Sequence, residues 1–166
     1  LSLAAYIVAF NAALRYTSAS HVALYLGASP VWALLWEARD DRRARQPRRF
    51  LAALLALTGV GVLLWPALET SSLNLRGELL AFVGSVLWVN YGRQSRKLAA
   101  TLNGAEVTAH TMWRAGVWLL PFGLVEVARC GLPLSLKLLG VQAYCIVAGG
   151  VVAFGLWNQA LRHWPT

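Results

Sequence analysis

Polar and aromatic side chains recur at helical spacing inside the long apolar runs of this chain. His21, Tyr25 and Ser29 follow one another every four residues, and Trp32 and Trp36 continue the same stripe. Residues three or four apart share one face of an α-helix. A face that combines aromatic rings with hydrogen-bonding groups suits an apolar or aromatic small molecule with a charged end. The spacing therefore predicts a binding surface for a small metabolite.

Three further segments present faces of the same kind. They hold Ser85, Trp88 and Tyr91 in the first, His110, Trp113 and Arg114 in the second, and Phe154, Trp157 and Asn158 in the third. Because a polar group in an apolar surrounding is costly, each face is expected to point toward protein or water. The sequence predicts a substrate cavity lined by Tyr25, Ser29, Trp88, Tyr91, His110, Trp113 and Arg114.

Arg114 is a cation well inside an apolar run, and two interpretations of it stay open. It could provide the counter-charge for a substrate carboxylate, or its long side chain could extend to the membrane surface. Trp88 could line the cavity or belong to an interfacial aromatic belt. Asn11 and Asn158 are predicted to make hydrogen bonds between helices.

Motifs for membrane-embedded enzyme chemistry are absent from the sequence. The aspartates are confined to Asp40 and Asp41, in a basic stretch, and no His-Glu-x-x-His motif occurs. Cys130 and Cys145 have no metal-ligand spacing to a histidine. We therefore predict no catalytic residue, no metal site, no cofactor and no enzymatic activity. All glutamates near the apolar runs lie at their edges, so a proton-coupling group is expected outside this chain or at a histidine such as His110.

The composition places these residues in a membrane. Of the 166 residues, 58% are hydrophobic and 13% are charged, and the formal net charge is +8. Such a chain is too apolar to be disordered, and two cysteines cannot build a disulfide scaffold. The basic residues form short clusters between apolar runs, which argues against nucleic-acid binding. The composition therefore indicates a multi-pass membrane protein, with the lipid bilayer as a partner.

Six segments are predicted to cross the membrane as helices, since each is close to the roughly 17–25 apolar residues that a span requires. They are Leu1–Tyr16, Ala19–Trp36, Phe50–Leu68, Leu75–Tyr91, Val107–Val127 and Leu138–Leu161. Six arginines lie in the loop Glu37–Arg49, and that side of the membrane holds ten basic residues against four on the other. An excess of positive residues marks the cytoplasmic side. The basic loop is therefore predicted to be cytoplasmic.

An internal repeat links the first and last of these segments. The pattern Asn-x-Ala-Leu-Arg followed by a ring residue begins at Asn11 and again at Asn158. The two copies are five crossings apart, so they are predicted to run through the membrane in opposite directions. Inverted repeats of this kind are typical of secondary transporters.

Several stretches resemble the EamA module of the drug/metabolite transporter superfamily. They are Ala13–Ala19 with Ser29-Pro30-Val31, Leu57–Leu64, Gly77–Ala81 leading to Trp88, and Leu156–Arg162. The resemblance implies ten helices in two inverted repeats of five, of which this chain would supply helices three to eight. Residues 1–68 would be the end of the first repeat, and residues 75–166 would be the start of the second. Residues 80–84 and 102–104 are similar to the aromatic amino acid exporter branch.

We therefore predict a fragment of a transporter, and more specifically of an exporter, that moves small metabolites such as amino acids by alternating access. The substrate class comes from the resemblance, whereas the composition indicates only the membrane. Two alternatives stay open. The same spans could form a membrane scaffold or binding protein without transport, or an inactive transporter fragment.

Overall fold

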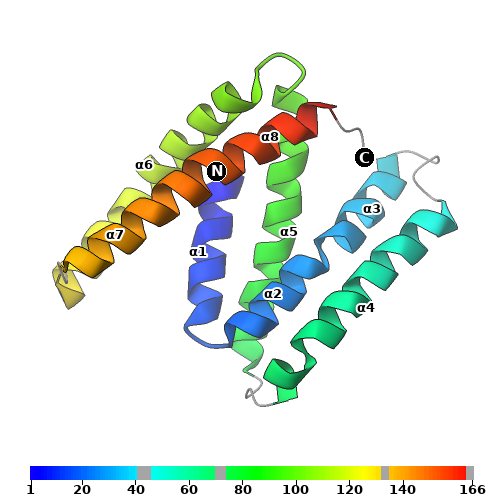
Figure 1. Ribbon diagram of the computed structural model, residues 1–166, viewed down its shortest axis with the longest axis horizontal. Helices are drawn as coiled ribbons and strands as arrows, with labels where there is room; N and C mark the ends of the chain where they lie inside the picture. Colours follow the sequence, from blue (N-terminus) through cyan, green and yellow to red (C-terminus); the bar gives the residue numbers. More distant parts are fainter. Residues whose placement is uncertain (41–45, 70–73, 132–134, 164–166) are drawn as a thin grey trace. The chain divides into compact units, whose positions relative to one another are not determined.

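The computed structural model describes residues 1–40, 46–69, 74–131 and 135–163. Within these ranges all regular elements are helices and no strand occurs, which confirms the predicted all-α class. The elements are α1 (Ser2–Leu14), α2 (Ala19–Gly27), α3 (Ser29–Asp40), α4 (Pro47–Glu69), α5 (Leu75–Leu98), α6 (Gly104–Cys130), α7 (Leu136–Tyr144), the π-helix η2 (Cys145–Ala153) and α8 (Phe154–His163) (Figure 1).

The chain divides into two compact units, and the boundary falls within α5. Apart from the first three residues, the first unit is Ala4–Asn90 and the second is Tyr91–Thr166. In the first unit, α2 and α3 follow one another along α4 (Figure 1). In the second unit, α6 packs against α8, and α7 leads through η2 into α8.

The predicted span Ala19–Trp36 is divided into two helices, which corrects the expectation of one continuous helix. The hydroxyl of Ser18 caps the start of α2 by accepting from the backbone N–H of His21. The division falls at Ala28, two residues before Pro30. Proline has no N–H and disfavours helical backbone in the residue before it, so the hydrogen-bonding ladder is interrupted at this point.

The predicted span Leu138–Leu161 lies within one continuous apolar helical stretch, Leu136–Leu161, in which the type of helix changes. Its middle, Cys145–Ala153, is a π-helix with Gly149 and Gly150 at its centre. Paired glycines weaken the regular ladder because they lack side chains and gain conformational freedom. The other predicted spans coincide with helices, although α5 continues beyond Tyr91 to Leu98.

Two stretches are long and apolar enough to cross a membrane by length and composition. They are Pro47–Pro66 in α4 and Leu136–Leu161, which spans α7, η2 and α8. In the most apolar 18 residues of each stretch, the share buried by protein is only 6% in the first and 0% in the second. A core helix of a water-soluble protein would be mostly buried, so lipid is the natural surrounding for these two. The count of six spans stays a prediction.

The predicted cytoplasmic loop can be tested by cysteine labelling in whole cells. Residues 41–45 of this loop lie outside the described residues, whereas Gln46 is described and exposed just before α4. With the free cysteines Cys130 and Cys145 replaced by serine, Gln46→Cys in the full-length protein is expected to resist a membrane-impermeant maleimide. Labelling is expected only after the cells are permeabilised. Labelling in intact cells would reverse the predicted orientation.

Candidate functional site

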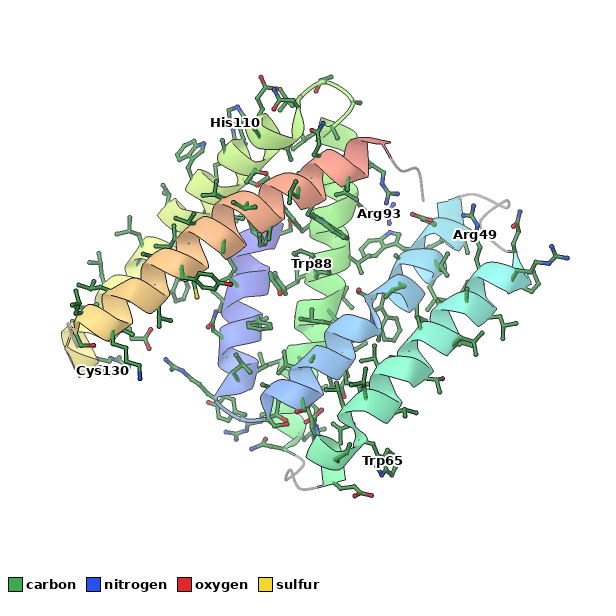
Figure 2. The ribbon with its side chains drawn as sticks, viewed as in Figure 1. Arg49, Trp65, Trp88, Arg93, His110 and Cys130 are labelled. Atoms are coloured by element: carbon green, nitrogen blue, oxygen red, sulfur yellow. The ribbon has the colours of Figure 1, made fainter. Side chains whose placement is uncertain are left out.

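Aromatic side chains of α5 contact rings from two other helices of the first unit. The ring of Trp88 packs against Tyr6 of α1 with centroids 5.2 Å apart, and Trp88 lies near the middle of α5 (Figure 2). Farther toward the start of α5, Phe82 makes an edge-to-face contact with Trp32 of α3 at 5.3 Å. Trp88 is half-buried against the ring of Tyr6, so this side of α5 contacts protein and is also partly exposed.

Two buried polar atoms of the first unit have no hydrogen-bond partner among the described residues. They are the hydroxyl oxygen of Ser85, a residue with 0% exposure, and the indole nitrogen of Trp32. Leaving such a group unpaired costs about 1–3 kcal/mol. A polar atom that tolerates this cost is a candidate contact for a substrate. Both residues lie on the stripes seen in the sequence, but the stripes do not reveal which members lack a partner.

Tyr25 and Ser29 lie on either side of the break between α2 and α3. Tyr25 is half-buried and packs against the small core of Ala13, Val22 and Ala81. Ser29 begins α3 and is also half-buried. The break therefore brings two members of the predicted cavity to the ends of neighbouring helices, where the backbone is irregular.

A buried acid–base cluster joins the start of α5 to the start of α2. The Oε1 atom of Glu78 lies 2.6 Å from Nδ1 of His21 and accepts a hydrogen bond of 2.7 Å from the hydroxyl of Thr17. The side chains of His21 and Glu78 are only 8% and 12% exposed. Tyr25 interacts with the same carboxylate through its hydroxyl group. The sequence places Glu78 at a span edge but gives no sign of these partners.

Close backbone contact makes this cluster possible. A Cβ atom at Gly77 would lie 2.7 Å from Cβ of Thr17 and 2.9 Å from its backbone nitrogen. Only glycine allows α5 to approach the turn before α2 so closely. The adjacent Glu78 therefore reaches His21 without extending into water.

The second unit contains a buried hydrogen-bond network. Asn158 of α8 donates from Nδ2 to the hydroxyl of Thr108, at 2.9 Å, and to the hydroxyl of Tyr91, at 3.2 Å. The hydroxyl of Tyr91 also lies 3.5 Å from that of Thr111. Thr108 in turn donates to the carbonyl of Gly104 at 2.7 Å. Tyr91, a member of the predicted cavity, is 1% exposed and is thus engaged in joining α5, α6 and α8.

The remaining residues of the predicted cavity belong to α6 and lie on its exposed side. His110, Trp113 and Arg114 are all exposed, and Figure 2 shows His110 on the side of α6 away from α8. The guanidinium carbon of Arg114 lies 5.9 Å from the ring centroid of Trp113, its neighbour in the chain. The face of α6 that packs holds Thr108 and Ala115 instead. The structure does not bring these three residues together with Tyr91, and their place in a cavity stays a prediction.

The two asparagines of the sequence repeat have different surroundings. Asn158 is 1% exposed and contacts residues of two other helices. Asn11 is exposed and donates to the carbonyl of Ile7 in its own helix at 2.8 Å. Its predicted contact with another helix is therefore not among the hydrogen bonds of the described residues.

Comparison with known proteins assigns this helical chain to a class of membrane transporters. Residues 75–166 match the EamA-like transporter family, and this match covers more than half of the chain. The chain therefore belongs to the EamA-like transporter family. Its members are multi-pass membrane proteins, in agreement with the two exposed apolar stretches.

Two curated relatives extend the similarity to nearly the whole chain. An uncharacterized transporter of Archaeoglobus fulgidus is 25% identical over 153 residues, which cover 91% of this chain and 52% of the relative. The uncharacterized transporter YyaM of Bacillus subtilis is 25% identical over 171 residues, covering 95% of this chain and 54% of the relative. The chain spans about half the length of these relatives. No solved structure gives a significant match.

Proposed function

We propose that this chain is the central part of a carrier that moves a small metabolite, such as an amino acid, across the inner membrane. Membership of the EamA-like transporter family carries this proposal, and both relatives are named as transporters. The resemblance to the EamA module implies a carrier of ten helices in two inverted repeats, and this chain spans about half the length of its two relatives. Residues 1–68 and 75–166 would belong to different repeats, and their relative motion would expose the substrate to each side in turn. Export is the proposed direction.

The proposed substrate cavity combines aromatic contacts with polar groups. Trp88 supplies ring surface, and the unpaired Ser85 hydroxyl and Trp32 indole nitrogen supply hydrogen-bonding atoms. Besides these two groups, the cavity that we propose contains the residues predicted from the sequence: Tyr25, Ser29, Trp88, Tyr91, His110, Trp113 and Arg114. Arg114 would pair with a substrate carboxylate. An aromatic amino acid meets all these requirements, so phenylalanine is a suitable probe.

Flux measurements on the full-length carrier test this function. Reconstituted in proteoliposomes, it is expected to move tritiated L-phenylalanine, whereas a scaffold protein would give no flux above empty vesicles. Trp88→Ala is expected to lower the flux about 2- to 10-fold, because a lost ring contact is worth about 0.5–1.5 kcal/mol. Arg114→Ala should reduce phenylalanine flux more than flux of 2-phenylethylamine, which lacks the carboxylate.

Trp65→Ala is the matched control for these variants. Trp65 lies near the end of α4, is 60% exposed, and is not among the proposed cavity residues (Figure 2). Its loss is expected to leave flux within twofold of the unmodified carrier. If Trp88→Ala and Arg114→Ala behave like this control, the proposed cavity is wrong even where transport itself is observed.

A further inference from the structure

Basic side chains gather where α3 ends and α4 begins. Arg39 lies in the last turn of α3, whereas Arg48 and Arg49 lie in the first turn of α4. These two helices contact each other in the first unit, and Figure 2 shows Arg49 at the end of α4 that lies beside the end of α3. All three arginines are exposed, and their guanidinium groups have no hydrogen bond or ion pair within the described ranges of the chain. Three cations at one end of this helix pair are therefore open to a ligand.

The length of α4 places these cations beside lipid headgroups. Its apolar stretch Pro47–Pro66 has 20 residues and is roughly 30 Å long, which is also the thickness of the hydrocarbon core of a bilayer. Arg48 and Arg49 lie in the first turn of this stretch, so they lie at the headgroups of one leaflet when α4 crosses the membrane. Trp36, one turn before Arg39, is 37% exposed, and tryptophan is enriched at this depth. The phosphate groups of lipids are therefore within reach of the arginines.

Exposed leucines continue the face of α4 on which Arg48 lies. Residues three and seven positions apart in a helix share a face, and Leu51 and Leu55 occupy these positions after Arg48. They are 60% and 64% exposed. A phospholipid has the matching order of groups, since its charged phosphate is followed by apolar chains that can lie along the helix. A free phosphate ion would leave both leucines uncovered, so this surface fits a lipid better.

The other end of α4 has the same kind of apolar surface but a different charge. Leu63 is 81% exposed, and the last turn of the helix holds no basic residue. Glu69 is exposed there and accepts a hydrogen bond of 2.6 Å from the indole of Trp65. An anionic headgroup is therefore complemented by charge at the start of α4 and repelled at its end.

We propose that Arg39, Arg48 and Arg49, together with Leu51 and Leu55, bind an anionic phospholipid in preference to a zwitterionic one. A guanidinium group donates two parallel hydrogen bonds to a phosphate, and phosphatidylglycerol has no ammonium group that the arginines would repel. The acyl chains of the lipid lie against the leucines. None of these residues belongs to the proposed substrate cavity, so the site is independent of the proposed transport function.

Quenching of a fluorescent label by spin-labelled lipids tests the site in the full-length carrier. Its cysteines, Cys130 and Cys145 among them, are replaced by serine, and Leu55→Cys carries a bimane label. The carrier is reconstituted in phosphatidylcholine nanodiscs in which some of the lipid, either phosphatidylglycerol or phosphatidylcholine, has a spin label on its acyl chain.

The mole fraction that gives half-maximal quenching at Leu55 is expected to be on the order of 10- to 100-fold lower for phosphatidylglycerol than for phosphatidylcholine, because each arginine near the membrane surface strengthens the binding of an anionic lipid. The measurement requires no transported substrate, so a failure of the proposed transport function does not affect it. If the two lipids quench this label alike, the proposal is overturned.

Arg48→Gln combined with Arg49→Gln removes two charges from exposed positions. This change is expected to reduce the preference for phosphatidylglycerol at the Leu55 label by roughly tenfold or more. Quenching by phosphatidylcholine is expected to stay the same, which shows that α4 is still inserted. Arg48→Lys combined with Arg49→Lys keeps both charges and is expected to keep most of the preference. An unchanged preference in the glutamine variant would place the bound lipid elsewhere and contradict the proposal.

Leu63→Cys is the matched control, because it places the label on an exposed leucine at the other end of α4. There the two lipids are expected to quench within about twofold of each other, since no arginine of the site is near. The same preference at both positions would show only a general attraction of anionic lipid to a basic protein and would overturn the proposal. Inorganic phosphate, added at constant ionic strength, is expected to leave the preference at Leu55 unchanged. If it abolishes the preference, the arginines bind free phosphate and the proposed lipid site is wrong.

Discussion

Replacing Gly104 with alanine is expected to destabilise the packing of α6 against α8 by about 2–3 kcal/mol, because the added methyl group has no room. A Cβ atom on Gly104 would lie 2.6 Å from the backbone nitrogen of Gln159 and 2.8 Å from its Cα atom. These are backbone atoms of α8, which can yield only if the helix moves. The same movement would strain the hydrogen bond of 3.1 Å from the Gly104 N–H to the Gln159 side chain.

Gly116→Ala provides the matched control in the same helix. A Cβ atom at Gly116 would meet nothing within 4 Å. There the substitution is expected to stabilise by about 0.5–1 kcal/mol, since alanine favours helical backbone. Equilibrium unfolding of the full-length carrier in mixed detergent and SDS micelles would measure both changes. Equal effects of the two substitutions would contradict the close contact between α6 and α8.

The positions of most helices could be predicted from the sequence, because long apolar runs mark them, whereas local signals set their exact limits. Pro47 occupies the first position of α4, where its missing N–H costs nothing. Asn103 caps α6, and the side chain of Glu106 bonds back to the Asn103 backbone. The division of the predicted span Ala19–Trp36 was not predicted, although Pro30 was visible. Pro30 has no N–H to donate to the carbonyl one turn earlier in a helix. The sequence does not show whether neighbouring groups keep the helix continuous despite this lost hydrogen bond.

Contacts between distant segments could not be predicted in the same way. Helical periodicity shows which residues share a face, but it does not show which other helix meets that face. His21 and Glu78 were each visible, one on a stripe and the other at a span edge, and nothing local connects them. The sequence left a proton-coupling group outside this chain or at a histidine such as His110, and only the structure shows the carboxylate of Glu78 beside His21.

The α6 helix shows a related ambiguity. One of its faces holds the aromatic and cationic side chains of His110, Trp113 and Arg114, which drew the prediction of a cavity. Its buried face holds the small residues Thr108 and Ala115, and Thr108 accepts a hydrogen bond from Asn158 of α8. Small residues let helices in a membrane approach closely, and their hydroxyl groups can bond across the contact. Composition alone could not decide which face meets the rest of the chain.

Replacing Asn158 with alanine is expected to destabilise the carrier by about 1–3 kcal/mol, because buried partners would lose their hydrogen bonds. Asn158 is only 1% exposed, and its side chain donates hydrogen bonds to Thr108 and Tyr91. After the substitution the hydroxyl of Tyr91 would lose the hydrogen bond of 3.2 Å from Asn158, and its contact with Thr111 is long at 3.5 Å. Equilibrium unfolding of the full-length carrier in mixed micelles would give the change.

A double-mutant cycle with Thr108→Val separates the hydrogen bond from lost packing. The coupling energy between Asn158 and Thr108 is expected to be about 0.6–1.7 kcal/mol, the range for bonds between membrane helices. Asn11→Ala is the matched control, because Asn11 occupies the same place in the sequence repeat but is exposed and bonds to its own helix. It is expected to cost less than about 0.5 kcal/mol. If Asn11→Ala lowers the free energy of unfolding as much as Asn158→Ala does, the difference predicted between the two asparagines is wrong. Asn11 would then also join two helices in the carrier.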